Sequence, residues 1–293
     1  MASNGNPISM PPQEDLTEVK KPTSLLVAQF FLFPLMVIGF GVGVFLLFGY
    51  ITQEQKSPQA YLDEIRRGTE TRRWQAAFEL SKVIAAQKEE LQNTAFAGDV
   101  LDLYESAESG DPQIRQFLAI SLGHLGDPAA IPALTEGLND STAETQIWTL
   151  WALGTIGDPQ GASGVVKKLQ SDDPAVRKTA VYVLGALKDP STIRDLQVAL
   201  NDGVADVRWN AAMALARLND AAGADLLIQL TNREYLDQFS EMSVVEKDNA
   251  IVNAVKCLSI LKLKSAREEI TSLSESDQSL VVRNAALEAL TTY

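Results

Sequence analysis

The 293-residue sequence contains one cysteine, Cys257, and one histidine, His124. A single cysteine cannot form an intrachain disulfide, and a single histidine excludes metal sites built from several histidines. The sequence also lacks a CxxC motif, a phosphate-binding glycine loop and a nucleophile elbow. We therefore expect no catalytic residues, no metal site and no cofactor. His124 is expected to be a solvated surface residue and Cys257 a core residue.

Basic residues are scarce as well, because 25 lysines and arginines face 38 aspartates and glutamates, for a net charge of −13. Nucleic acids are bound through clustered Lys and Arg side chains, so the charge balance argues against a nucleic acid partner. It also argues against non-specific adhesion to anionic lipid. No stretch alternates between polar and apolar residues with period two, and no strands are expected.

One long apolar run, Leu25 to Tyr50, carries no charged residue. A transmembrane helix needs about 20 apolar residues. The run is longer than the apolar core of a signal peptide, and no small-residue cleavage site follows it. The sequence therefore predicts a single transmembrane helix over residues 24–50. Pro34 is expected to kink it, and Gly39 and Gly43 form a G-x-x-x-G motif that lets another helix approach closely.

The segments on either side of this helix differ in character. Residues 1–23 are polar and proline-rich without periodicity, which predicts a disordered N-terminal tail. Residues 51–69 are predicted to be a juxtamembrane linker with a short helix that begins at Ser57 and Pro58. Lys20 and Lys21 abut the apolar run on its N-terminal side. This charge bias favours an N-terminus inside the cell and a C-terminal domain outside the cytoplasm, in the periplasm if the source is bacterial.

Residues 111–220 repeat with a period of 31, and further copies extend the array over residues 70–293. One series of positions is Arg115, Gln146, Arg177 and Arg208, and a second is Asp127, Asp158, Asp189 and Asp220. Gly123, Gly154, Gly185 and Ala216 lie four residues before the aspartates. A fixed period in this range is typical of a solenoid. The glycines are expected to mark close packing or a helix end.

About seven amphipathic first helices follow from the repeat, each followed by a turn and a second amphipathic helix. They are expected near residues 71–84, 112–125, 143–156, 174–187, 205–218, 248–261 and 279–291. Apolar residues at i, i+3, i+4 and i+7 indicate helix and not strand. The copies near the ends of the array are recognisable from RWQAAFEL at Arg73, which matches RWNAAMAL at Arg208, and from VVRNAALEAL around Arg283. The fold class is therefore all-α.

The unit from Asp173 to Pro190, DPAVRKTAVYVLGALKDP, resembles the short HEAT repeats found in phycobilin-lyase-like proteins. The resemblance covers residues 70–293 and implies a right-handed αα superhelix, a HEAT solenoid preceded by the transmembrane helix. It also implies that the Arg and Asp positions link neighbouring repeats, so that these arginines are structural. Gln146 breaks the arginine series without an evident reason. Asp172 and Asp173 are expected to cap a helix.

Numbering each first helix from its arginine position separates the core from the surface. Positions −1, +3, +7 and +10 share one narrow arc, which we expect to be buried. Position +5 points away from that arc, yet it is apolar across five units, and positions +1 and +2 add further aromatic residues. The resulting apolar ridge consists of Trp74, Phe78, Phe117, Ile120, Ile147, Trp148, Trp151, Tyr182, Trp209 and Met213.

Two interpretations of the apolar ridge are open. Its side chains could pack against a neighbouring repeat or a loop, or they could form an exposed patch that binds a protein partner. Aromatic residues and methionine are favoured in protein interfaces, whereas the negative net charge disfavours lipid contact. The connection over residues 231–246 is longer than the repeat allows. It is either a plain insertion or a functional loop.

The sequence as a whole favours a membrane-anchored HEAT scaffold or adaptor that is not an enzyme. Such a protein binds a protein partner at the membrane, for example as a subunit of a larger membrane complex. Two alternatives remain. One is a bilin-lyase-like enzyme, which the family resemblance alone implies. The other is a membrane sensor or assembly factor that pairs through Gly39 and Gly43.

Overall fold

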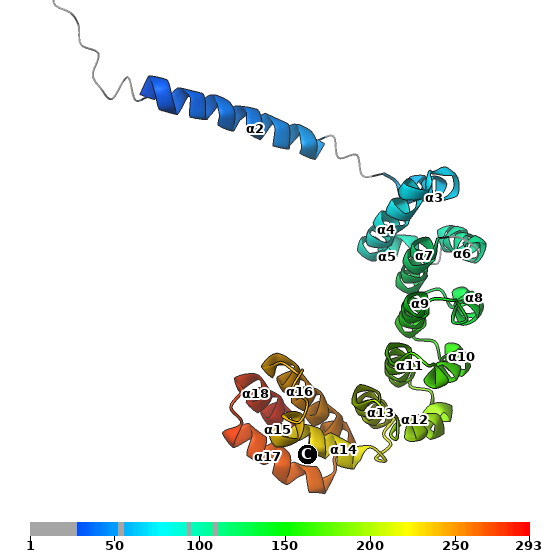
Figure 1. Ribbon diagram of the computed structural model, residues 1–293, viewed down its shortest axis with the longest axis vertical. Coiled ribbons are helices and arrows are strands. Elements are labelled where there is room, and N and C mark those ends of the chain that lie inside the picture. The colour runs from blue at the N-terminus through cyan, green and yellow to red at the C-terminus, as the bar shows by residue number, and fades with distance from the viewer. Residues whose placement is uncertain (1–27, 52–55, 93–94, 108–110) are drawn as a thin grey trace, which may run out of the picture. The chain divides into compact units, whose positions relative to one another are not determined.

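A computed structural model describes residues 28–51, 56–92, 95–107 and 111–293. These residues form helices and contain no strand, in agreement with the all-α prediction (Figure 1). The chain divides into two compact units, Met1–Gln55 and Lys56–Tyr293. The predicted disordered tail over residues 1–23 lies outside the described residues.

The first unit contains the helix α2 (Phe33–Ile51), which directly follows a π-helical turn, η1 (Ala28–Leu32). The stretch Phe30–Leu47 has a mean hydropathy of 2.5, and none of it is buried, so it is long and apolar enough to cross a membrane. Pro34 is the second residue of α2, and the π-helical turn before it accommodates the missing N–H group. No described atom lies within 4 Å of a Cβ built at Gly39 or Gly43.

The second unit is a curved row of helix pairs that begins with α3 (Pro58–Arg67), where the Ser57 side chain accepts a hydrogen bond from the Ala60 N–H. The first helices of the pairs are α4 (Glu70–Ala86), α7 (Pro112–Leu125), α9 (Ala143–Ile156), α11 (Pro174–Leu187), α13 (Ala205–Arg217), α16 (Val244–Leu261) and α18 (Leu280–Leu290). The second helices are α6 (Ala95–Ser106), α8 (Ile131–Gly137), α10 (Ala162–Lys167), α12 (Ile193–Ala199), α14 (Ala224–Thr231) and α17 (Lys264–Ser276). Short elements in the connections are α5 (Lys88–Leu91), η2 (Pro128–Ala130), η3 (Pro159–Gly161), η4 (Lys168–Gln170), η5 (Pro190–Thr192) and α15 (Arg233–Leu236).

Figure 1 shows that α7, α9, α11 and α13 follow one another on the inner side of the curve, whereas α8, α10 and α12 form its outer side. Successive first helices pack on one another along the row, and each second helix packs on the first helix of the next unit. The apolar core therefore lies between the two layers. Because the first helices bury one face against the second helices, their opposite face forms the inner surface of the solenoid.

The predicted core arc is confirmed in the regular units. In α11 its members Val176, Ala180, Leu184 and Leu187 are all buried. In α13 the first three equivalent residues are buried, and only Leu218, at the end of the helix, is half-buried. Cys257 in α16 is buried as predicted.

The glycine series marks close packing between neighbouring first helices. A Cβ at Gly185 would lie 2.8 Å from the Cβ of Ala214, and a Cβ at Gly123 would lie 2.9 Å from the Cα of Ala152. Real Cβ atoms do not approach other carbons so closely. These glycines therefore allow adjacent helices to stack at short range, which is one reason that the array forms a regular row.

The 31-residue aspartate series begins the short turns before the second helices. Asp127, Asp158 and Asp189 each accept a hydrogen bond at 2.9 Å from the backbone N–H two residues later. A proline follows each of them at the first helical position, where no N–H group is needed. Asp173 caps α11 in the predicted way, at 2.7 Å from the Ala175 N–H.

The C-terminal part departs from the regular unit. The helix α16 begins at Val244, four residues before the predicted start at 248, because Ser243 and Glu246 form a capping box. Within the longer connection, Asn232 caps the short helix α15, and Leu236 is fully buried. The connection is therefore a packed part of the solenoid.

Candidate functional site

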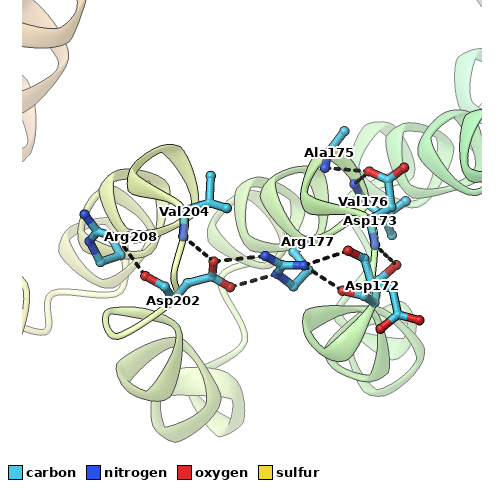
Figure 2. A network of polar contacts seen from close by, with 9 residues as sticks. Asp172, Asp173, Ala175, Val176, Arg177, Asp202, Val204 and Arg208 are labelled. Carbon is cyan, nitrogen blue, oxygen red and sulfur yellow. Dashed lines mark hydrogen bonds and ion pairs between the residues drawn. The ribbon is translucent and has the colours of Figure 1, made fainter. Parts of the chain in front are cut away.

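Two of the arginine positions, Arg115 and Arg177, form links between repeats of the kind that the family resemblance implied, and Figure 2 shows the link at Arg177. Within the described residues, Arg208 and Arg283 bond only to the connection before their own helix. Nε and Nη2 of Arg177 donate to the two carboxylate oxygens of Asp202 at 2.8 and 3.1 Å. Nη1 of Arg177 donates to the carbonyl of Ser171 at 2.8 Å. One guanidinium thus ties the connection before its own helix to the connection before the next one. The acidic partner is Asp202, however, and not a member of the 31-residue aspartate series.

The same link recurs with variations along the array. Arg115 lies 3.4 Å from Asp140, again 25 residues later in the sequence. Arg233, which the sequence analysis did not single out, pairs with Asp248 and Asp277 at 2.7 Å each. The guanidinium groups of Arg177 and Arg233 are thus engaged within the fold, whereas Nε and Nη1 of Arg115 are buried without a hydrogen-bond partner in the described part of the chain.

The structure also explains why Gln146 interrupts the arginine series. Its Nε2 donates to the carbonyl of Asp140 at 2.7 Å, just as Arg208 donates to the carbonyl of Asp202 six residues before it. The forward partner of Gln146, 25 residues later, would be Ser171, which has no carboxylate. Position 171 thus holds a neutral residue where the equivalent positions hold Asp140 and Asp202.

Three members of the apolar ridge are exposed at the inner surface. Phe78, Trp148 and Trp151 keep between 38 and 40% of their surface accessible. Six more are half-buried, namely Trp74, Phe117, Ile120, Ile147, Tyr182 and Met213. These three aromatic side chains are therefore available for contact with another molecule.

Members of the ridge also contact each other between repeats. The rings of Phe78 and Phe117 lie 5.2 Å apart, and those of Trp151 and Tyr182 lie 4.9 Å apart. The guanidinium of Arg217 lies 5.3 Å from the centre of the Tyr182 ring. Each pair is therefore held in place from one side by the next repeat and leaves another side accessible. The ridge is therefore partly packed and partly exposed, and binding of a partner there stays a prediction.

Trp209 is a correction to the predicted ridge, because only 6% of its surface is accessible. Its ring lies 4.8 Å from that of Phe239, and its Nε1 donates to the Tyr235 hydroxyl at 3.3 Å. Both partners belong to the longer connection, which folds back over α13. The connection has no counterpart in the other repeats, so the period of the sequence gave no signal for this contact.

The ridge ends in a groove of about 940 Å³ on the inner surface. Its lining comes from α9, α11, α13, α16 and the longer connection. The residues that matter below are Trp151, Lys178, Tyr182, Asp206, Arg208, Asn210, Met213, Arg217, Phe239, Glu241, Met242, Glu246, Asn249 and Asn253. The lining combines aromatic and methionine side chains with charged and amide side chains, so the groove is of mixed polarity.

The single histidine and the single cysteine lie on different helices, α7 and α16. His124 is half-buried rather than fully solvated, and burial together with the charge of Lys88 lowers its pKa. Burial raises the pKa of the Cys257 thiol to about 11, which leaves it protonated and unreactive at neutral pH. Within the described residues, no three His, Cys, Asp or Glu side chains are grouped so that they could hold a metal ion.

Comparison with known proteins identifies the repeats. Residues 100–168 and 162–241 match the family model of HEAT repeats. The solenoid is similar to the complex of CpcE and CpcF of phycocyanin lyase from Nostoc sp. PCC7120, with a TM-score of 0.54 and 19% identity over 82% of this chain and 88% of that one. This level of identity shows a shared fold. The solenoid also resembles an armadillo repeat protein obtained by design, with a TM-score of 0.43 and 16% identity over 81% of this chain and 99% of the other. A search of curated proteins gave no match.

Proposed function

We propose, from the premise that this chain is a HEAT-repeat protein, that it is a membrane-anchored scaffold whose solenoid binds a protein partner. The observation that carries the proposal is the row of accessible aromatic side chains, Phe78, Trp148 and Trp151, on the inner surface. HEAT and armadillo-like repeats form extended concave surfaces suited to protein binding. Accessible aromatic residues that are already held in place lose little conformational freedom when a partner covers them.

The outer surface offers a useful contrast. Among the second helices, which form this surface, the most accessible large apolar residue is Val198 in α12. The other exposed residues of these helices are polar or small. Aromatic residues in contact with one another are concentrated on the first helices and the longer connection. The inner surface is therefore the better candidate for the contact with a partner.

The anchor is the second part of the proposal. The stretch Phe30–Leu47 has the length and hydropathy of a membrane span and carries no charged residue. The solenoid begins at α3 (Pro58–Arg67), a short distance later in the chain. A partner bound to the solenoid is therefore expected to be a membrane protein or a protein held at the membrane, such as another subunit of a membrane complex. Lys20 and Lys21 support an N-terminus inside the cell and a solenoid outside the cytoplasm.

Two experiments test these two parts separately. Full-length protein is expected to remain in the membrane pellet after an alkaline carbonate wash, whereas a variant that lacks residues 28–51 is expected in the supernatant. Release of the full-length protein by carbonate would refute the anchor. For the binding surface, a photo-crosslinking amino acid at Trp148 should capture a partner in native membranes, whereas the same group at Val198 should capture none. Equal yields at both positions would refute the proposed surface.

A further inference from the structure

The groove at the C-terminal end of the apolar ridge combines two kinds of wall. On one side Tyr182 stacks on Trp151 at 4.9 Å and carries the guanidinium of Arg217 on its ring at 5.3 Å. On the other side Phe239 packs at 4.8 Å on the buried ring of Trp209. Since α13 packs against both α11 and α16, its residue Met213 lies in the middle of the groove. All these side chains are fixed by contacts within the solenoid, so the groove is preformed.

One of the three cations of the groove has an acidic partner, since Lys178 pairs with Asp206 at 3.1 Å. Arg208 donates to the carbonyl of Asp202 at 2.7 Å, and Arg217 lies on the ring of Tyr182, so both keep their positive charge. Both arginines belong to α13 and lie on that side of the groove.

The negative charges on the opposite wall are not compensated. Glu241 is exposed and forms no ion pair with any described residue. Glu246 accepts hydrogen bonds only from Ser243, and these bonds lower its pKa and keep it ionised. The side of the groove formed by the longer connection therefore presents two carboxylates without a cationic partner. The net charge of −13 adds to this negative potential.

The remaining polar groups of the groove suit a peptide backbone. Asn249 and Asn253 lie four residues apart on α16, hence on one face of the helix, and both are exposed and line the groove. Each amide can donate and accept a hydrogen bond, which is what the N–H and C=O groups of an extended segment require. The volume of about 940 Å³ lies at the upper end of the range for ligand pockets and has room for several side chains.

We propose that this groove receives a short segment of the protein partner that presents an apolar side chain next to a lysine or arginine. The apolar side chain contacts Tyr182, Met213 and Phe239, and the cation meets Glu241 and Glu246. This inference rests on the proposed function, because it specifies the chemistry of the partner at one end of the same inner surface. It explains why the longer connection is packed over α13, since this packing builds the acidic wall.

The test uses the full chain in detergent and a phage-displayed library of random peptides of about twelve residues. Selected peptides are expected to share an aromatic or aliphatic residue close to a lysine or arginine. Their dissociation constants are then measured by fluorescence anisotropy on three variants. Glu241→Lys is expected to weaken binding about tenfold, and Asn253→Trp, which fills the groove, should abolish it. Glu268→Lys is the matched control, because it reverses an equally exposed charge on α17 and should leave affinity unchanged.

Several results would overturn the inference. The inference fails if the library yields no binder, if the selected peptides lack a basic residue, or if they bind Glu241→Lys and Glu268→Lys with equal affinity. Circular dichroism of each variant separates a lost contact from a lost fold. Failure of the proposed function is distinguishable from failure of this inference. If capture of a partner at Trp148 persists while Glu241→Lys has no effect on any ligand, the scaffold stands and the charged groove does not.

Discussion

The guanidinium of Arg177 and the carboxylate of Asp202 form two parallel hydrogen bonds, 2.8 and 3.1 Å long, across the boundary between two repeats. Asp202 lies in the connection before α13, while Arg177 belongs to α11, so the pair joins two units that the chain also links covalently. Bidentate pairs of this kind are stronger and more directional than single hydrogen bonds. The accessible fraction of the two side chains is 17% and 12%, and the pair is thus largely shielded from water.

Removing the carboxylate should destabilise the solenoid. For Asp202→Ala we expect a loss of about 2 to 4 kcal/mol in the free energy of unfolding, because a shielded guanidinium would lose its counter-charge. The matched control is Asp206→Ala, whose pair with Lys178 is 3.1 Å long but about half exposed, and which should cost less than about 1 kcal/mol. Urea unfolding followed by circular dichroism measures both. Similar losses for the two variants would show that the inter-repeat link contributes no more than a surface pair.

The carboxylates in these links should make stability depend on pH. The hydrogen bonds from Arg177 hold the pKa of Asp202 below its usual range. For Asp277, burial alone would raise the pKa, but the hydrogen bonds from Arg233 and from the Ser279 N–H outweigh it, and the pKa is lowered. A lowered pKa in the folded state contributes stability above the pKa of the unfolded state, about 3.9 for Asp. That contribution is lost as the pH falls through the lower, folded value.

We therefore expect the melting temperature to change little through these two groups between pH 7 and about 5, and to fall as the pH drops below about 4. In Asp202→Asn the fall should be shallower, because one of the two titrating groups is gone. Differential scanning calorimetry over a pH series provides the measurement. Parallel curves for the parent protein and the variant would refute the assignment of this pH dependence to Asp202.

Two glycine substitutions are expected to change the stability in opposite directions. Gly185→Ala places a Cβ 2.8 Å from that of Ala214 on the next first helix and is expected to cost about 1 to 3 kcal/mol. Gly98→Ala, inside α6, meets no atom within 4 Å and should stabilise by about 0.5 to 1 kcal/mol through helix propensity. Thermal unfolding of both variants, compared with the parent protein, measures the two changes in stability. Stabilisation by Gly185→Ala would mean that neighbouring helices do not approach as closely as described.

Much of the repeat fold is predictable from the sequence because each feature depends on local or periodic information. The buried arc containing Val176 and Leu184 follows from helical periodicity, and the cap at Asp173 follows from the hydrogen-bonding reach of a short side chain. The glycine series can be predicted for the same reason, since a glycine such as Gly185 recurs from unit to unit at the place where two helices meet most closely.

Other features depend on contacts that have no period. The partner of Arg177 could not be identified beforehand, because Asp202 lies in a turn whose geometry the sequence does not define. The glutamine at position 146 could be explained only from the link geometry, because the residue 25 positions later, Ser171, carries no carboxylate. Trp209 was expected at the surface because its position in the repeat points there, but Phe239 from the longer connection covers it. The burial of Trp209 therefore depends on long-range packing of a segment that occurs once in the chain.

The central claim is that accessible aromatic residues on the inner surface bind a protein partner. Its most direct test is quantitative co-purification from native membranes in mild detergent, with Trp151→Glu and Tyr182→Glu combined in one variant. The matched control is Val198→Glu, because Val198 is 62% exposed on the outer helix α12. With circular dichroism showing an intact fold for both, we predict that the double variant recovers less than about a tenth of the partner. Val198→Glu should recover it fully, and equal recovery by the two variants would contradict the account.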